Sequence, residues 1–269
     1  MGLLRTPGHA PLFRNAIRPC VSAFKPEYLT FNEIAWIALA GFVASTMAAL
    51  TGTGGGILLL PVLVVTLGVQ DAIPAYTLAQ FIGNLSRVGF NRSELRFEVV
   101  AWFIVGAVPA AALGALLFAR TQEHVLIRAL GLFLLATVAW RHLNPNKSIG
   151  FPVKRFAPIG AVFGFISGYM GSAGPFLAPF FLAFGLARGA YIGTEALGTA
   201  VMHITRMTAY GATNVFPYRA VLFGMALTPI MIAGSFAGKG LLDRISPSVF
   251  VLIIETILVV FGLLFLIRG

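Results

Sequence analysis

Charged residues and cysteine are what this chain has least of. Only 10% of its 269 residues are charged, whereas 58% are hydrophobic, and there is a single cysteine, Cys20. Soluble globular domains have about a quarter of their residues charged, so this composition excludes that class and predicts a polytopic membrane protein. One cysteine cannot build a disulfide framework or a thiolate metal cluster within the chain. The redox compartment is left undetermined.

Acidic residues are also scarce. The chain has nine Asp and Glu and 19 Lys and Arg, which gives a net charge of +10. The basic residues lie in short flanks between apolar runs, which is typical of membrane proteins and not of nucleic-acid binding. A lipid bilayer is therefore an expected partner, and nucleic acid is not. Residues 1–30 form a basic N-terminal arm without the continuous apolar core of a signal peptide, so we expect a retained, cytoplasmic arm.

Ten apolar segments follow the arm, and the expected fold is all-α and polytopic, with two homologous halves of about four to five segments each. The chain then divides into a first membrane repeat (31–140), a basic inter-repeat loop (141–155) and a second membrane repeat (156–269). The second segment of each repeat is too short to cross a bilayer. We expect it to be re-entrant or half of a broken helix. The segments are Phe31–Leu50, Ile57–Gly68, Ala72–Phe90, Phe97–Ala119, Val125–Trp140, Phe156–Met170, Phe176–Ala187, Gly189–Tyr210, Pro217–Gly238 and Ser246–Ile267.

Each half contains a glycine-rich break that is followed 35 residues later by an arginine. Gly52 begins the first break and precedes Arg87, while Gly171 begins the second and precedes Arg206. A shift of 119 residues relates the two halves. Broken helices at matching places indicate a transporter whose site lies between two repeats. The direction of the repeats stays open, because two cytoplasmic basic flanks would require parallel repeats, whereas five crossings would require inverted ones.

A polar stripe follows each break. The stripe of the first half contains Tyr76, Gln80, Asn84 and Arg87, and the stripe of the second half contains Glu195, Thr199, His203 and Arg206. Spacings of three and four residues place each stripe on one helical face, which should turn to the protein interior because polar groups are costly in lipid. Arginine binds oxyanions through a planar fork, and two arginines would neutralise a divalent anion. The alternatives are that Arg87 marks a helix end and that Arg206 snorkels to the interface.

The glycine breaks are predicted to supply backbone donors to the same anion. Consecutive glycines let several N–H groups converge, and the start of the next helix adds its positive dipole end. Close packing of helices is the alternative explanation of the glycines. The candidate binding residues in the breaks are Thr53, Gly54, Gly55, Gly56, Ser172 and Gly174.

Two acids lie within apolar segments and are candidates for carrying a coupling proton. Glu195 shares a helical face with His203 and Arg206, and a static ion pair is the alternative role for it. Glu255 ranks second, because it has no equivalent in the first half. No metal or cofactor is expected, since the sequence contains neither HExxH nor a nucleotide-binding glycine loop.

At these residues the chain resembles the TauE/SafE family, the sulfite exporter group of membrane proteins. The resemblance rests on the glycine-rich motif 52–56 leading to Pro61, the weaker echo 171–175 leading to Pro179, and the duplicated layout from Phe31 to Ile267. It implies movement of sulfur-containing anions such as sulfite and organosulfonates.

The expected function is secondary transport of sulfite, thiosulfate or an organosulfonate across the cytoplasmic membrane, with protons as the coupling ion. The transported anion would reach a site between the repeats by alternating access. A passive anion channel and, less favoured, an intramembrane enzyme are the alternatives. Association into a homo-oligomer stays open.

Overall fold

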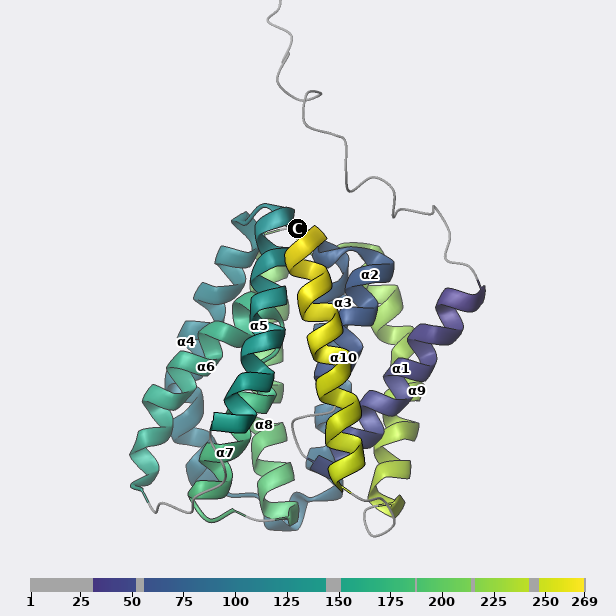
Figure 1. Ribbon diagram of the computed structural model, residues 1–269. Coiled ribbons are helices and arrows are strands. Elements are labelled where there is room, and N and C mark those ends of the chain that lie inside the picture. The colour runs from purple at the N-terminus through teal and green to yellow at the C-terminus, as the bar shows by residue number, and fades with distance from the viewer. Residues whose placement is uncertain are drawn as a thin grey trace, which may run out of the picture.

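The computed structural model describes residues 31–51, 56–143, 151–186, 188–213, 216–241 and 247–268, and the regular elements in these ranges are all helices (Figure 1). This confirms the all-α prediction, and each predicted apolar segment corresponds to one helix. The helices are α1 (Phe31–Thr51), α2 (Leu59–Leu67), α3 (Val69–Phe90), α4 (Phe97–Arg120), α5 (Glu123–Leu143), α6 (Phe156–Met170), α7 (Gly174–Ala183), α8 (Arg188–Ala212), α9 (Tyr218–Leu241) and α10 (Pro247–Arg268). Three short 3-10 helices are η2 (Gly56–Leu58), η3 (Arg92–Glu94) and η4 (Val153–Arg155).

Four helices in the described part of the chain are long and apolar enough to cross a membrane, with spans at Phe31–Ala49, Phe97–Arg120, Glu123–Trp140 and Tyr218–Gly238. The protein is therefore a multi-pass membrane protein. By contrast, α2 has nine residues and α7 has ten. A spanning helix needs about 20 residues, so neither crosses alone. Each of these short helices follows a glycine-rich break, as predicted.

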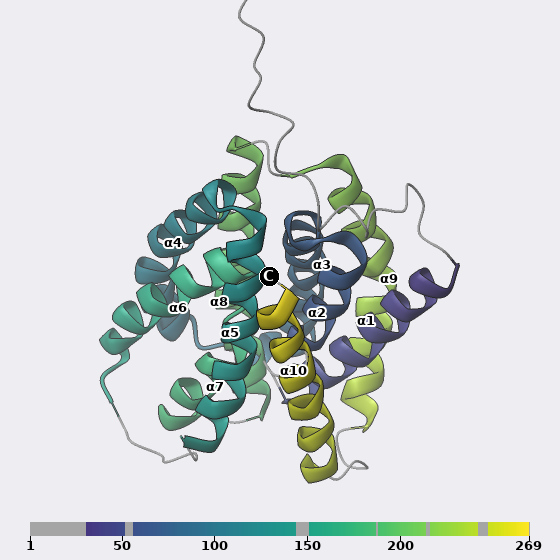
Figure 2. The ribbon, with the colours of Figure 1, turned by 45° about the horizontal axis from the view of Figure 1, so that its top comes forward.

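The first helix of each half packs on the fourth helix of the other half through glycines. On the α4–α6 pair, a Cβ atom at Gly106 would lie 1.9 Å from the carbonyl oxygen of Ala157. On the α1–α9 pair, a Cβ at Gly238 would lie 2.4 Å from the carbonyl oxygen of Thr46. Glycine lets the backbones touch, as in other close helix crossings in membranes. We call these two contacts the glycine seams, and they lie on opposite sides of the molecule in Figures 1 and 2.

Contacts along the helix pairs show the direction in which each helix runs. Residue numbers rise together along α4 and α6 and along α1 and α9, so these pairs are parallel. They rise in opposite senses along α3 and α8 and along α5 and α10, so these pairs are antiparallel. The parallel pairs are shown by Phe103–Gly160 and Ala111–Gly168 for α4 and α6, and by Gly41–Leu227 and Thr46–Gly238 for α1 and α9. The antiparallel pairs are shown by Thr77–Arg206 and Arg87–Glu195 for α3 and α8, and by Gly131–Gly262 and His142–Glu255 for α5 and α10.

The two halves consequently run in opposite directions through the molecule. α3 and α4 are joined by the turn 91–96 and are antiparallel, as are α8 and α9, so α1, α3, α4 and α5 each run opposite to their counterparts α6, α8, α9 and α10. In Figure 1, α2 lies near the end where the chain terminates and α7 near the other end. The first residues of α1 and α6 accordingly lie at opposite ends of the molecule. The N-terminal arm is outside the described residues.

The helices group into two bundles that each combine both halves. We call α1, α2, α3 and α9 the first bundle, and α4, α6, α7 and α8 the second. The bundles meet where α3 packs on α8, and α5 and α10 pack on one another beside this contact (Figure 2). The α3–α8 interface is thus the place where the two polar stripes face each other.

Candidate functional site

The polar stripes lie in the interior of the protein, as their spacing predicted. Arg206 is completely buried, and Arg87 is 5% exposed. The other members, all less than 9% exposed, are Tyr76, Gln80, Asn84, Glu195, Thr199 and His203. Neither arginine therefore snorkels to the surface. Burial of this many polar groups between apolar neighbours requires internal partners, because an unsatisfied polar group in a dry interior is costly.

The antiparallel packing of α3 and α8 places the two arginines at opposite ends of the polar stripes, with Arg87 opposite Glu195 and Arg206 opposite Thr77. Arg87 lies in the last turn of α3, and Arg206 lies in the second half of α8. Side chains on a helix lean toward its N-terminus. Because the two helices run in opposite directions, both guanidinium groups lean toward the middle of the interface. Gln80, Asn84 and their counterparts on α8 occupy the helical turns between them.

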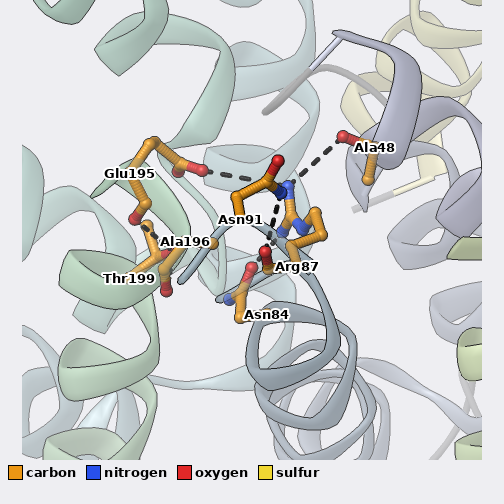
Figure 3. A network of polar contacts seen from close by, with 7 residues as sticks. All are labelled: Ala48, Asn84, Arg87, Asn91, Glu195, Ala196 and Thr199. Atoms are coloured by element: carbon orange, nitrogen blue, oxygen red, sulfur yellow. Dashed lines mark hydrogen bonds and ion pairs between the residues drawn. The ribbon is translucent and has the colours of Figure 1, made fainter. Parts of the chain in front are cut away.

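The Arg87 guanidinium links three segments of the chain (Figure 3). Its Nη1 donates to the carbonyl oxygen of Ala48 in α1 at 3.4 Å, and its Nη2 donates to the side-chain oxygen of Asn84. Nη1 also lies 3.8 Å from Oε2 of Glu195 across the interface. Glu195 therefore pairs with the arginine of the other half, and not with Arg206 of its own helix.

The Arg206 guanidinium holds the end of the broken helix α6. Its Nη1 donates to the carbonyl oxygen of Gly171 at 2.7 Å and to Oγ of Ser167 at 3.4 Å, and it lies 3.2 Å from Nδ1 of His203. Its Nη2 donates to Oγ1 of Thr77 on α3. A cation at a helix C-terminus is stabilised by the exposed carbonyls and the negative end of the helix dipole.

The two arginine environments correspond in position. Arg87 contacts Ala48, 39 residues before it, and Arg206 contacts Ser167, also 39 residues before it. Each arginine also contacts the stripe residue three positions earlier, which is Asn84 in α3 and His203 in α8. Each arginine thus reaches the end of the first helix of its own half. Position 77 was not among the predicted site residues, yet it supplies the cross-interface partner of Arg206.

The glycine-rich breaks lie beside the stripes where the structure describes them. A Cβ atom at Gly56 would lie 2.6 Å from Nε2 of Gln80, so this side chain lies directly on the backbone of the break. Gly171 adopts a left-handed φ of 88°, which favours glycine, and it ends α6 beside Arg206. Ser172 is buried and Gly174 begins α7. The predicted residues Thr53, Gly54 and Gly55 lie outside the described residues.

Three buried polar atoms of the stripes make no hydrogen bond within the described part of the protein. They are Nε2 of Gln80, Nε of Arg206 and Oε2 of Glu195, the last of which keeps its ion pair with Arg87. Two of the three are donors and both belong to predicted binding residues. A small oxyanion is a ligand that would use such buried donors.

Glu255 is not brought together with these residues. It lies on α10, and its Oε2 is 3.2 Å from Nε2 of His142 at the end of α5. No cluster of three or more His, Cys, Asp or Glu side chains suited to a metal ion occurs among the residues that the structure describes. The groups assembled at the α3–α8 interface are therefore two cations, one acid and neutral hydrogen-bonding side chains.

This arrangement defines a class, a multi-pass helical membrane protein with broken helices and buried cations between two halves, which is the layout of a transporter. The family model described as "Sulfite exporter TauE/SafE" matches residues 37–265, and the chain belongs to this family. It is also 28% identical, over 256 residues, to a protein named "Probable membrane transporter protein YjnA" from Bacillus subtilis (strain 168). That match covers 84% of this chain and 97% of the relative. No solved structure matches. The protein is accordingly a membrane transporter and not an enzyme.

Proposed function

We propose that this transporter moves a small sulfur-containing anion, sulfite, thiosulfate or an organosulfonate, and binds it between the two halves. The observation that carries the proposal is the pair of buried arginines, Arg87 and Arg206, that lean toward the middle of the α3–α8 interface. Two buried cations favour an anion, and the planar fork of arginine matches a sulfonate or sulfite oxygen pair. The description of the family as a sulfite exporter supports sulfur as the central atom.

Polar side chains between the arginines would complete the site. Gln80 and Asn84 from α3 face Thr199 and His203 from α8, and all four are buried. The unbonded Nε2 of Gln80 lies against Gly56, so a bound oxyanion there would meet an amide donor and the glycine backbone together. Ser172 and Gly174 occupy the corresponding place in the second half. Thr53, Gly54 and Gly55 are proposed to contribute backbone and hydroxyl donors.

Glu195 is proposed to couple transport to protons. As a carboxylate it neutralises Arg87 at 3.8 Å, which leaves one uncompensated cation, Arg206, in the site. Protonation of Glu195 would release Arg87 to the anion, and loss of the anion would let the ion pair form again. The carboxylate and the anion therefore compete for the same guanidinium, which is the condition for linking their binding.

Alternating access is proposed to occur by rocking of one bundle against the other. The glycine seams join helices within each bundle at backbone contact and leave little room for sliding. The α3–α8 interface is instead crossed by polar contacts, which can exchange partners. Opposite directions of the two halves allow the same motion to expose the site first at one end and then at the other.

Binding and flux measured together test the proposal. Purified protein would be titrated by calorimetry with sulfite, thiosulfate, sulfate, simple sulfonates and matching carboxylates, and the anions that bind would be followed in liposomes. We expect one class of sulfur anion to bind and to show saturable counterflow. Flux without counterflow would indicate a passive channel. If folded protein binds none of the anions in the panel, the sulfur-anion assignment is overturned.

A further inference from the structure

The turn between α3 and α4, residues 91–96, lies on α8 at the end of the interface where Arg87 meets Glu195. The backbone N–H of Arg96 donates to Oγ1 of Thr194 at 3.0 Å. Thr194 is completely buried and precedes Glu195 in the chain. The α4 end of the turn is thus anchored to the helical turn that presents the acid. Both α4 and α8 belong to the second bundle, so this anchor lies within one bundle.

The other end of the turn belongs to α3 in the first bundle. Asn91 ends α3, where its side-chain Nδ2 donates to the carbonyl oxygen of Arg87 at 2.8 Å and its backbone N–H donates to the same oxygen at 3.2 Å. Figure 3 shows Asn91 beside Arg87. Asn91 therefore moves with the helix end that carries the arginine, whereas Thr194 moves with the acid.

Two glycines on α8 allow this turn to lie directly on the helix. Gly189 and Gly193 are one helical turn apart and face the same way. A Cβ atom at Gly193 would lie 2.9 Å from Cβ of Asn91, and one at Gly189 would lie 2.2 Å from Oε1 of Glu94. Glu94 also places a carboxylate at the first turn of α8, where the helix dipole favours it. The contact of Asn91 with Gly193 joins the first bundle to the second.

We propose that this contact is a gate, and that Asn91 must leave Gly193 for the anion to pass this end of the α3–α8 interface. The inference rests on the proposed transport function. Rocking of the bundles separates Asn91 from Gly193, while Glu94, Leu95 and Arg96 stay on α8, so Arg92 and Ser93 act as the hinge. The gate lies beside the Arg87–Glu195 pair, so release of that pair and opening of the turn involve the same helix ends.

A reversible crosslink tests the gate. The variant is Cys20→Ser, Asn91→Cys, Gly193→Cys, in which the two new cysteines are the only ones in the chain. Disulfides have Cβ atoms about 3.8 Å apart, so the contact needs to widen by only about 1 Å to accept the bond. We expect oxidation to reduce anion flux in liposomes at least about tenfold and a reductant to restore it, because each 1.4 kcal/mol of added barrier is worth a factor of ten.

Two comparisons make the outcome decisive. Each single variant, Asn91→Cys and Gly193→Cys in the Cys20→Ser background, should keep its flux on oxidation. The crosslinked protein should still bind, from the open end, the anion of the panel that the wild-type protein binds in calorimetry. Flux that is equal in the fully crosslinked and reduced protein would overturn the gate and leave the transport proposal standing. Wild-type protein that neither binds nor moves any anion of the panel would overturn the transport proposal and the gate with it.

Discussion

Arg87 and Glu195 come from opposite halves of the chain and meet at 3.8 Å between Nη1 and Oε2 across the α3–α8 interface. Both side chains are buried. A buried ion pair adds little to stability, but the removal of one partner leaves a charge that must find another. On the proposed function that other partner is the transported anion, which makes the pair the first target for mutation.

Replacement of Glu195 by Gln should abolish the dependence of transport on a proton gradient while anion binding persists. The amide cannot carry the proton and cannot neutralise Arg87, so the arginine stays available to the anion at every pH. The measurement is flux in liposomes with and without an imposed pH gradient. Glu98→Gln, an exposed acid in the first turn of α4, is the matched control. If the Glu195→Gln protein still responds to the gradient, coupling lies elsewhere, and Glu255 is the next residue to test.

Replacement of Arg206 by Ala should abolish anion binding and also lower stability. Its guanidinium holds Gly171 and Thr77, and hydrogen bonds of charged groups contribute about 1.5–3 kcal/mol. Arg206→Lys keeps the charge but loses the fork, so we expect partial stability and weak binding. Calorimetry and thermal unfolding in detergent measure the two effects. The exposed Arg219 in α9, changed to Ala, is the control. Wild-type affinity in folded Arg206→Ala protein would remove Arg206 from the site.

The glycine seams should tolerate no side chain at their points of backbone contact. In Gly106→Ala the new Cβ would lie 1.9 Å from the carbonyl oxygen of Ala157, which cannot rotate away, so α4 and α6 must separate. We expect a loss of about 1–3 kcal/mol, as for other overpacked contacts. Gly89→Ala in α3 meets nothing within 4 Å and should be neutral or stabilising. Equal unfolding temperatures for the two variants would contradict the close packing.

Cysteines at the two ends of the molecule should react from opposite sides of the membrane. Cys20→Ser removes the natural thiol, and Phe31→Cys or Ser93→Cys then introduces one exposed thiol at the start of α1 or in η3. A membrane-impermeant maleimide should label one variant in intact cells and the other only in inverted vesicles. Labelling of both variants from the same side would contradict the placement of the start of α1 and the α3–α4 turn at opposite ends of the molecule.

The helices were largely predictable from the sequence, because apolar runs and glycine breaks mark their ends. The segment predicted at Ser246–Ile267 forms α10 at Pro247–Arg268. The segment predicted at Phe176–Ala187 ends early, at Ala183, because Gly185 adopts a left-handed φ of 98° in a turn that hydropathy does not register. Burial of the polar stripes was also predictable, since lipid offers no partners to polar groups.

The partners of the buried charges were not predictable, because they depend on how helices pack. Glu195 shares a helical face with Arg206, but eleven residues of helix separate them by about 16 Å along the axis. Antiparallel packing brings Arg87 to Glu195 instead. The contact of Thr77 with Arg206 was not predictable for a different reason. A threonine in an apolar helix commonly bonds to the carbonyl four residues before it, as Thr77 does to Ile73 at 2.7 Å, and its second role is visible only across the interface.

Each glycine seam joins a helix of one half to a helix of the other half. This pairing affects the order in which the helices can pack during synthesis. α4 and α6 are separated only by α5, so the second bundle can assemble while the rest of the chain is still being synthesised. Among the described helices α1 leaves the ribosome first, yet its partner α9 is among the last to emerge. A truncated chain that stops before α9 would therefore leave the small residues of α1 without the surface that they match. Quality control in the cell would meet that exposed face in each copy that lacks α9.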